Sequence, residues 1–241
     1  MTAPSTVEGP AQQAGRSALR SLFIPGPAGR LESLLNEGAP EAQYAALICH
    51  PHPKGGGTLH NKVVYHAMKA LNAPEFGLRW PVLRFNFRGT GLSDGAHDGK
   101  AEAGDVQAAL HWLESEFKRP IILAGFSFGA AMALLACCGS DVRSQIASQI
   151  HAVVALGLPT QAEGHVYRYS FLSRCSLPKL FLSGERDQFA SAADLQRVAA
   201  TTAAPKKLVL VPGADHFFSG QLVTMQNELV GWLKEQQTCL L

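Results

Sequence analysis

Short, continuous apolar runs recur along the chain and alternate with segments of helical spacing. One such helix is marked by Val106, Leu110, Leu113 and Phe117, which would lie on a single face. Apolar runs without polar interruption are typical of strands that are buried on both faces. Their alternation with helices predicts an α/β domain built on a mostly parallel sheet with helices on both sides. The predicted strands are 45–49, 82–87, 121–124, 151–156, 180–182 and 208–211.

Turn and capping signals define the remaining elements. A Pro- and Gly-rich turn between 19–24 and 30–35 predicts an N-terminal hairpin. Ser191 and Asp194 form a capping box for a helix that extends to about residue 200. No repeat or linker divides the chain, so we expect a flexible tail at 1–17 and one domain over 18–241. Further helices are expected at 61–71, after residue 127, and around Leu222, Met225, Leu229 and Trp232.

The most informative motif is Gly125-Phe126-Ser127-Phe128-Gly129, which follows a predicted strand and opens a helix of small residues. A serine between two glycines at such a junction sits on a turn too tight for bulky neighbours. The turn exposes the hydroxyl at the sheet edge and directs the N–H of Phe128 toward a developing oxyanion. An alternative role for Ser127 is a helix N-cap, but the flanking glycines favour a nucleophile.

A serine nucleophile needs a general base and an acid that orients the base. His216 lies in the loop after the last predicted strand, and Asp187 follows the strand before it. Both positions fall at the edge of the sheet where Ser127 is expected. Glu185 and Asp215 are rival acids, although Asp215 is adjacent to His216 in sequence and would point elsewhere.

A second cluster, His50-Pro51-His52-Pro53-Lys54 followed by three glycines, comes directly after a predicted strand. An oxyanion hole needs two N–H donors, and the second typically comes from this loop. Proline has no N–H, which favours the backbone of His52 as the donor. The alternative is a metal site formed by His50 and His52 with His60 or His66, but no third ligand has convincing spacing. We therefore expect no metal and no cofactor, and a structural role for His50.

The loop at 85–95 contains Gly89-Thr90-Gly91 and invites comparison with nucleotide-binding loops. It lacks the Gly-Lys-Ser/Thr ending, and a lone Gly-x-Gly is a weak signal. We expect it to form a wall of the site, with Arg88 and Asp94 paired within it.

Composition narrows the class of partner. The chain has 241 residues, 46% of them hydrophobic, and a formal net charge of +2 without a dense basic run. This argues against nucleic acid as a partner.

The uncharged stretch 120–140 is long enough to cross a bilayer, but its break at Phe126-Ser127 favours a buried strand, turn and helix. The five cysteines have no metal-ligand spacing, and Cys137-Cys138 lies in an apolar run. Buried free thiols and a cytoplasmic location are therefore expected.

These residues together resemble the α/β-hydrolase superfamily, and more narrowly a bacterial group of small cap-less hydrolases related to dienelactone hydrolases and carboxylesterases. The similar stretches cover about 40–235 and include the 50–57 loop, Arg84 to Gly89, Ala124 to Gly129 and Pro212 to Phe218. The resemblance implies an eight-stranded, mostly parallel sheet and a triad in the order Ser127, Asp187, His216. Pro51 departs from it, because many members carry glycine beside this loop.

The implied function is hydrolysis of a small-molecule carboxylic ester with a short to medium acyl chain. The segment between about 157 and 179 is too short for a large lid. Residues 160–176 could form a small flap, with Tyr167, Tyr169 and Phe171 either lining a pocket or packing as a mini-core. A thioesterase, peptidase or perhydrolase would use the same triad, and a catalytically idle binding module is an alternative of another class. The sequence carries no indication of oligomeric state.

Overall fold

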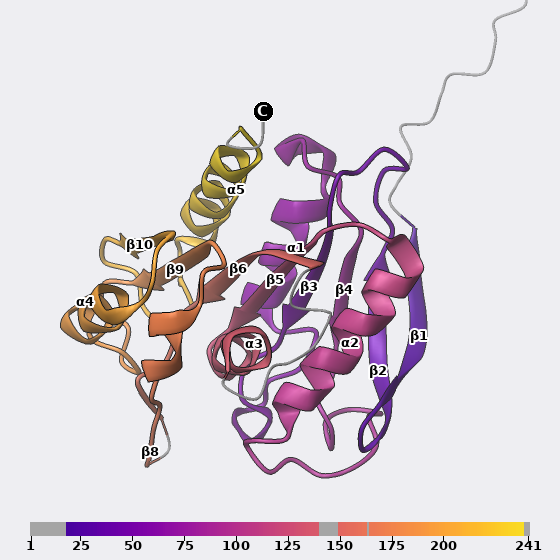
Figure 1. Cartoon of the computed structure of the whole chain (residues 1–241), viewed down its shortest axis with the longest axis horizontal. Helices are drawn as coiled ribbons and strands as arrows, with labels where there is room; N and C mark the ends of the chain where they lie inside the picture. Colours follow the sequence, from indigo (N-terminus) through magenta and orange to yellow (C-terminus); the bar gives the residue numbers. More distant parts are fainter. Residues whose placement is uncertain (1–17, 140–148, 163, 239–241) are drawn as a thin grey trace, which may run out of the picture.

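The structure is a computed structural model that describes residues 18–139, 149–162 and 164–238. An eight-stranded sheet runs through it in the order β1-β2-β4-β3-β5-β6-β9-β10 (Figure 1). The first two strands, β1 (Leu19–Gly26) and β2 (Gly29–Asn36), form the expected hairpin, and β2 also pairs antiparallel with β4 (Val82–Phe85). The other neighbours pair in parallel: β3 (Ala45–Cys49), β5 (Ile121–Phe126), β6 (Ile150–Leu156), β9 (Lys179–Gly184) and β10 (Lys206–Val211).

Helices cover both faces of this sheet because the central strands are apolar on both sides. On the face toward the viewer in Figure 1 lie α2 (Glu102–Phe117) and α3 (Phe128–Cys138), and α4 (Ala192–Thr201) packs beside β10. The opposite face is covered by α1 (Lys62–Asn72) and α5 (Leu222–Thr238). Two hydrophobic cores result, one on each side of the sheet. This is the α/β-hydrolase fold that the sequence predicts.

The helix ends follow the capping signals of the sequence. The Asn61 side chain accepts the Val63 N–H at the start of α1, and Ser191 accepts the Asp194 N–H at the start of α4. The predicted capping box at Ser191 is thus confirmed. The strand β4 ends at Phe85, two residues earlier than predicted, because the chain then turns into the loop that leads to α2.

The segment between β6 and β9 contains only small elements. These are the two-stranded pair β7 (Gln161–Ala162) and β8 (His165–Val166) and the 3-10 helix η4 (Ser170–Arg174). Within the described residues, no large cap covers the carboxyl edge of the sheet. Across all the residues that the structure describes, no helix is long and apolar enough to cross a membrane. The expected tail at 1–17 lies outside the described residues, so it stays a prediction.

One expectation about the cysteines is wrong. Cys138 at the end of α3 forms a disulfide with Cys175 after η4, although the sequence predicted a free thiol. The two positions are 37 residues apart, so only the packing of η4 against α3 brings them together. Cys49 and Cys137 are buried free thiols, as predicted. Burial raises the pKa of Cys137 to about 12, and it also raises the pKa of Cys49.

Candidate active site

The predicted site residues follow the carboxyl ends of the parallel strands. Ser127 comes after β5, Asp187 after β9 and His216 after β10. These strands run in the same direction, so their ends meet at one edge of the sheet. The 50–57 loop reaches the same edge from β3.

Ser127 sits on a sharp turn between β5 and α3. Its backbone angles are φ 55° and ψ −121°, a conformation that few residues other than glycine adopt. The neighbouring glycines allow it: a Cβ on Gly125 would lie 2.3 Å from the Gly129 carbonyl oxygen, and one on Gly129 would lie 2.4 Å from the oxygens of Cys49 and His50. Strain of this kind typically costs ~1–3 kcal/mol and is found at functional sites. The Ser127 N–H donates to the Leu156 carbonyl of β6, which anchors the turn to the sheet.

His216 and Asp187 form a buried pair. His216 Nδ1 lies 2.7 Å from Asp187 Oδ2, and the two residues are 2% and 6% exposed. The second carboxylate oxygen of Asp187 accepts the Phe189 N–H, so both oxygens are held. Because Nδ1 faces the carboxylate, Nε2 is the ring nitrogen left for another partner. The imidazole also packs against the ring of Phe126, with centroids 4.9 Å apart, and Phe126 directly precedes Ser127.

The two rival acids are directed elsewhere. Asp215 Oδ1 accepts the N–H groups of Phe217 and Ser219, and these bonds, chiefly the one from Ser219, hold the pKa of Asp215 below its usual value. Glu185 accepts the N–H of Gly213. Of the three carboxylates that the sequence suggested, Asp187 is the one in contact with His216.

The expected oxyanion donors, Phe128 and His52, lie side by side. Their rings meet edge to face with centroids 5.0 Å apart. Phe128 is the first residue of α3, and the first N–H groups of a helix have no carbonyl partner within it. His52 precedes the 3-10 helix η1 (Pro53–Gly55), and its carbonyl accepts the N–H groups of Gly55 and Gly57. The loop is therefore folded tightly on itself beside the start of α3.

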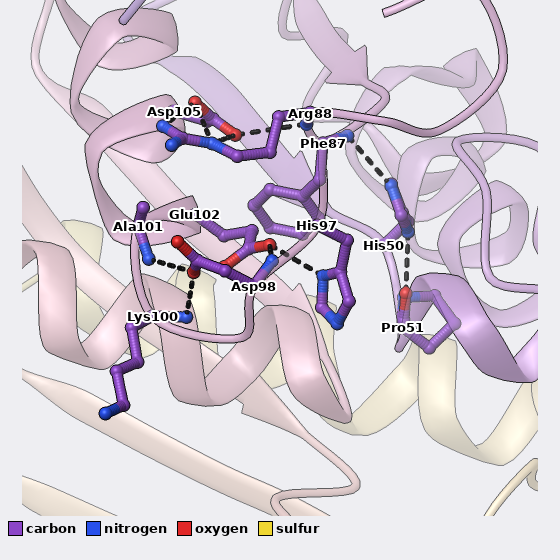
Figure 2. A network of polar contacts seen from close by, with 10 residues as sticks. All are labelled: His50, Pro51, Phe87, Arg88, His97, Asp98, Lys100, Ala101, Glu102 and Asp105. Carbon is purple, nitrogen blue, oxygen red and sulfur yellow. Dashed lines mark hydrogen bonds and ion pairs between the residues drawn. The ribbon is translucent and has the colours of Figure 1, made fainter. Parts of the chain in front are cut away.

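His50 holds this loop in place. Its Nδ1 lies 2.6 Å from the Pro51 carbonyl oxygen and its Nε2 accepts the Phe87 N–H at 3.0 Å (Figure 2). Burial lowers the pKa of His50 to about 4, so the ring is neutral. Both nitrogens are engaged with backbone groups, which makes His50 a poor metal ligand. Among the described residues, no group of three or more His, Cys, Asp or Glu side chains is placed to hold a metal ion.

The three aromatic residues of the 160–176 segment pack with one another. Tyr167 and Tyr169 are stacked with ring centroids 6.4 Å apart, and Phe171 meets Tyr169 at 6.2 Å. Tyr169 is buried and donates its hydroxyl to the Pro159 carbonyl. This burial raises the pKa of Tyr169 well above its ordinary value. The packing resembles a small core of the loop, and a role of these residues in a substrate pocket stays a prediction.

Another histidine, His97, also lies at this edge, and the sequence motifs did not single it out. His97 packs edge to face on His52 and Phe128, with ring centroids 4.7 and 5.5 Å away. Its Nδ1 lies 2.6 Å from Oε1 of Glu102, the first residue of α2 (Figure 2). The two atoms are at ion-pair distance, although they are not aligned as a hydrogen bond. A signal for this pair exists in the sequence, because Glu102 and Asp105 fall on the helix face of Val106 and Ala109.

The loop that carries His97 is fixed by a buried ion pair. Arg88 binds both oxygens of Asp105 through its guanidinium and donates its backbone N–H to the same carboxylate. The hydrogen bond to Asp105 raises the pKa of Arg88. The expected Arg88–Asp94 pair is wrong: Asp94 instead accepts the backbone N–H and guanidinium of Arg30 on β2. The loop is thus tied to α2 at one point and to β2 at another.

Comparisons with known proteins agree with this architecture. A family model described as an alpha/beta hydrolase domain matches residues 48–229. An uncharacterized protein of Rickettsia prowazekii is 33% identical over 205 residues, which cover 82% of this chain and 81% of that protein.

Solved structures show the same likeness. An alpha-beta serine hydrolase homologue from Coxiella burnetii has 32% sequence identity and a TM-score of 0.75, over 89% of this chain and 97% of that one. A serine hydrolase without a lid from Xanthomonas campestris has 27% identity and a TM-score of 0.74, over 94% of this chain and 97% of that one.

Proposed function

The chain belongs to the alpha/beta hydrolase family, and from this premise we propose that it is a serine hydrolase acting on carboxylic esters. Its substrate is a small-molecule ester with a short to medium acyl chain. The reaction passes through an acyl-enzyme on Ser127, with His216 as the base and Asp187 as the residue that orients it.

The proposed reaction has two halves. Ser127 Oγ attacks the ester carbonyl carbon while its proton passes to His216 Nε2. The N–H groups of Phe128 and His52 stabilise the negative charge on the carbonyl oxygen. When the tetrahedral intermediate collapses, the alcohol leaves with the proton from His216. Water then attacks the acyl-enzyme and gives a proton to His216. His216 returns this proton to Ser127 Oγ as the carboxylic acid leaves, which regenerates the free enzyme.

The observation that carries this proposal is the buried His216–Asp187 contact beside the turn of Ser127. Asp187 Oδ2 fixes the imidazole at 2.7 Å through Nδ1, which is the arrangement that a general base requires. The contact between Phe126 and His216 puts the imidazole against the residue that precedes Ser127. The positive φ of Ser127 is a strained conformation typical of such nucleophiles.

Labelling with a fluorophosphonate probe tests the nucleophile. The probe should react with wild-type protein at Ser127, and Ser127→Ala should lose both the label and the turnover of p-nitrophenyl acetate while keeping the wild-type circular dichroism spectrum. A matched control is Ser173→Ala, because Ser173 is an exposed serine on η4 away from the sheet edge. This control should retain label and turnover.

The outcomes separate the alternatives. A folded protein that the probe does not label would reject the nucleophile and favour an idle binding module. A labelled protein that prefers thioesters, peptides or peracid formation over esters would keep the triad and correct the substrate class. A parallel screen of matched oxygen esters, thioesters and peptide amides distinguishes these cases.

A further inference from the structure

A cavity opens beside the proposed oxyanion donors. It has a volume of about 530 Å³ and lies between the loop at 53–58 and the loop at 89–97. Glycines and other small residues form most of its wall, and its polar side chains include Lys54, Thr90 and His97. A site built this way offers few apolar side chains against which an aliphatic chain could be buried.

The cavity lies next to residues of the candidate active site. Pro53, which lines it, directly follows His52. His97, which also lines it, packs on the rings of both His52 and Phe128. Phe128 in turn directly follows Ser127. A substrate whose carbonyl lies at Ser127 would therefore have one of its ends next to this cavity.

His97 is held in a defined orientation. Its Nδ1 faces Glu102, which is fully buried and whose Oε1 also accepts the Asp98 N–H. The Asp98 carboxylate in turn accepts the N–H groups of Lys100 and Ala101 at the start of α2 (Figure 2). Nδ1 is turned toward the buried Glu102 carboxylate, so Nε2 is the ring nitrogen of His97 that is left for a ligand.

Thr90 provides a second polar group. The residue is only 7% exposed, and its hydroxyl Oγ1 has no hydrogen-bond partner among the described residues. A buried hydroxyl without a partner costs about 1–3 kcal/mol, so Thr90 Oγ1 calls for a partner that the described residues do not supply. Thr90 and His97 lie on the same loop, which the Arg88–Asp105 pair anchors.

We infer that this cavity binds a hydroxyl-bearing part of the ester substrate, with Thr90 Oγ1 and His97 Nε2 as its hydrogen-bonding groups. The inference rests on the proposed function, because it concerns the substrate that Ser127 attacks. It adds a chemical class to that function: esters whose alcohol or acyl part carries a hydroxyl group near the scissile bond. Each lost hydrogen bond in such a site lowers kcat/KM by about tenfold.

Two pairs of isosteric esters test this class. On the alcohol side, 2-hydroxyethyl butyrate is compared with propyl butyrate; on the acyl side, methyl 3-hydroxybutyrate is compared with methyl 3-methylbutanoate. In each pair a hydroxyl replaces a methyl group of similar size. Acid release at constant pH gives kcat and KM. Wild-type protein should prefer the hydroxylated ester by about tenfold in at least one pair, mainly through KM, and that pair identifies the end of the substrate in the cavity.

Matched variants assign the preference to the two residues. Thr90→Val and His97→Phe keep size but remove the polar group, so they should reduce the preference to less than about threefold. Thr90→Ser and His97→Gln keep a hydrogen-bonding atom and should retain most of it. His111→Gln, on the exposed side of α2, is the control and should behave as wild type. Thermal melts establish that each variant is folded.

The results that overturn the inference are distinct from those that overturn the proposed function. If the probe labels Ser127 but wild type treats both ester pairs alike, or if folded Thr90→Val and His97→Phe keep the full preference, the hydroxyl subsite is wrong. If Ser127 is not labelled, the proposed function fails, and calorimetric binding of the ester pairs to Ser127→Ala decides the subsite. Equal affinity for both members of each pair would reject it.

Discussion

At the scale of single residues, His50 connects the two loops that meet at the site. Its ring bridges the Pro51 carbonyl and the Phe87 N–H, so the loop after β3 and the loop after β4 share one buried side chain. A neutral ring can accept one of these bonds and donate the other, whereas a protonated ring cannot accept. The geometry therefore depends on His50 remaining uncharged.

This dependence predicts a loss of stability in acid. The pKa of His50 falls from 6.5 to about 4 on folding, so the unfolded chain takes up the proton first as the pH drops. The contribution of His50 is fully present above about pH 6.5 and declines toward pH 4, by up to ~3 kcal/mol. Urea unfolding between pH 7 and pH 4.5 measures it. His50→Asn should be less stable at pH 7 but should lose less on acidification; an unchanged pH slope would contradict the assignment.

At the scale of elements, the loop between β4 and α2 is shaped by contacts on both sides. Arg88 reaches forward to Asp105 on α2, while Asp94 reaches back to Arg30 on β2. The first pair is buried and the second is exposed, although each carboxylate accepts a backbone N–H and a guanidinium of its partner. The protein thus contains two versions of one interaction in different surroundings.

The two pairs predict unequal effects of the same substitution. Asp105→Asn leaves the Arg88 guanidinium largely buried without its counter-charge and should cost ~3 kcal/mol or more in unfolding free energy. Asp94→Asn, the matched control, removes a pair that water already screens and should have a much smaller effect. Chemical denaturation of both variants measures the difference. Equal losses would show that burial does not decide the strength of the pair.

The sequence predicts local elements well and tertiary pairings poorly. The Ser127 turn, the capping box at Ser191 and the N-terminal hairpin depend on residues close in the chain, and their patterns identify them. The sequence suggested Asp94 as the partner of Arg88, whereas the tertiary placement of α2 brings Asp105 to it. The Cys138–Cys175 disulfide depends on the docking of η4 on α3. The roles of Ser127, Asp187 and His216 remain predictions until the serine is labelled.

At the scale of the whole molecule, the sheet edge that carries the site is bordered by loops rather than by a cap domain. The small β7–β8 pair and η4 are the described elements between β6 and β9. A long aliphatic chain gains about 0.8 kcal/mol for each methylene group that the protein buries. A site with little covering surface can bury few methylene groups of such a chain, so the chain gains little binding free energy there.

This openness predicts the chain-length preference of the proposed esterase. Across p-nitrophenyl esters from C2 to C16, kcat/KM should be highest for short and medium chains and should fall for the longest. No sudden increase in rate is expected when a substrate exceeds its solubility limit, because no large lid has to open at an interface. A clear preference for C14 or C16 esters would contradict this prediction.

The strand order also has a consequence for the newly synthesised protein. The turn of Ser127 is formed between β5 and α3 and anchored on β6, whereas His216 follows β10, which is the last described strand and an edge strand of the sheet. The proposed nucleophile therefore has no base until β10 docks on β9. Hydrolysis by a growing chain is therefore expected only after β10 has been synthesised and has docked on β9.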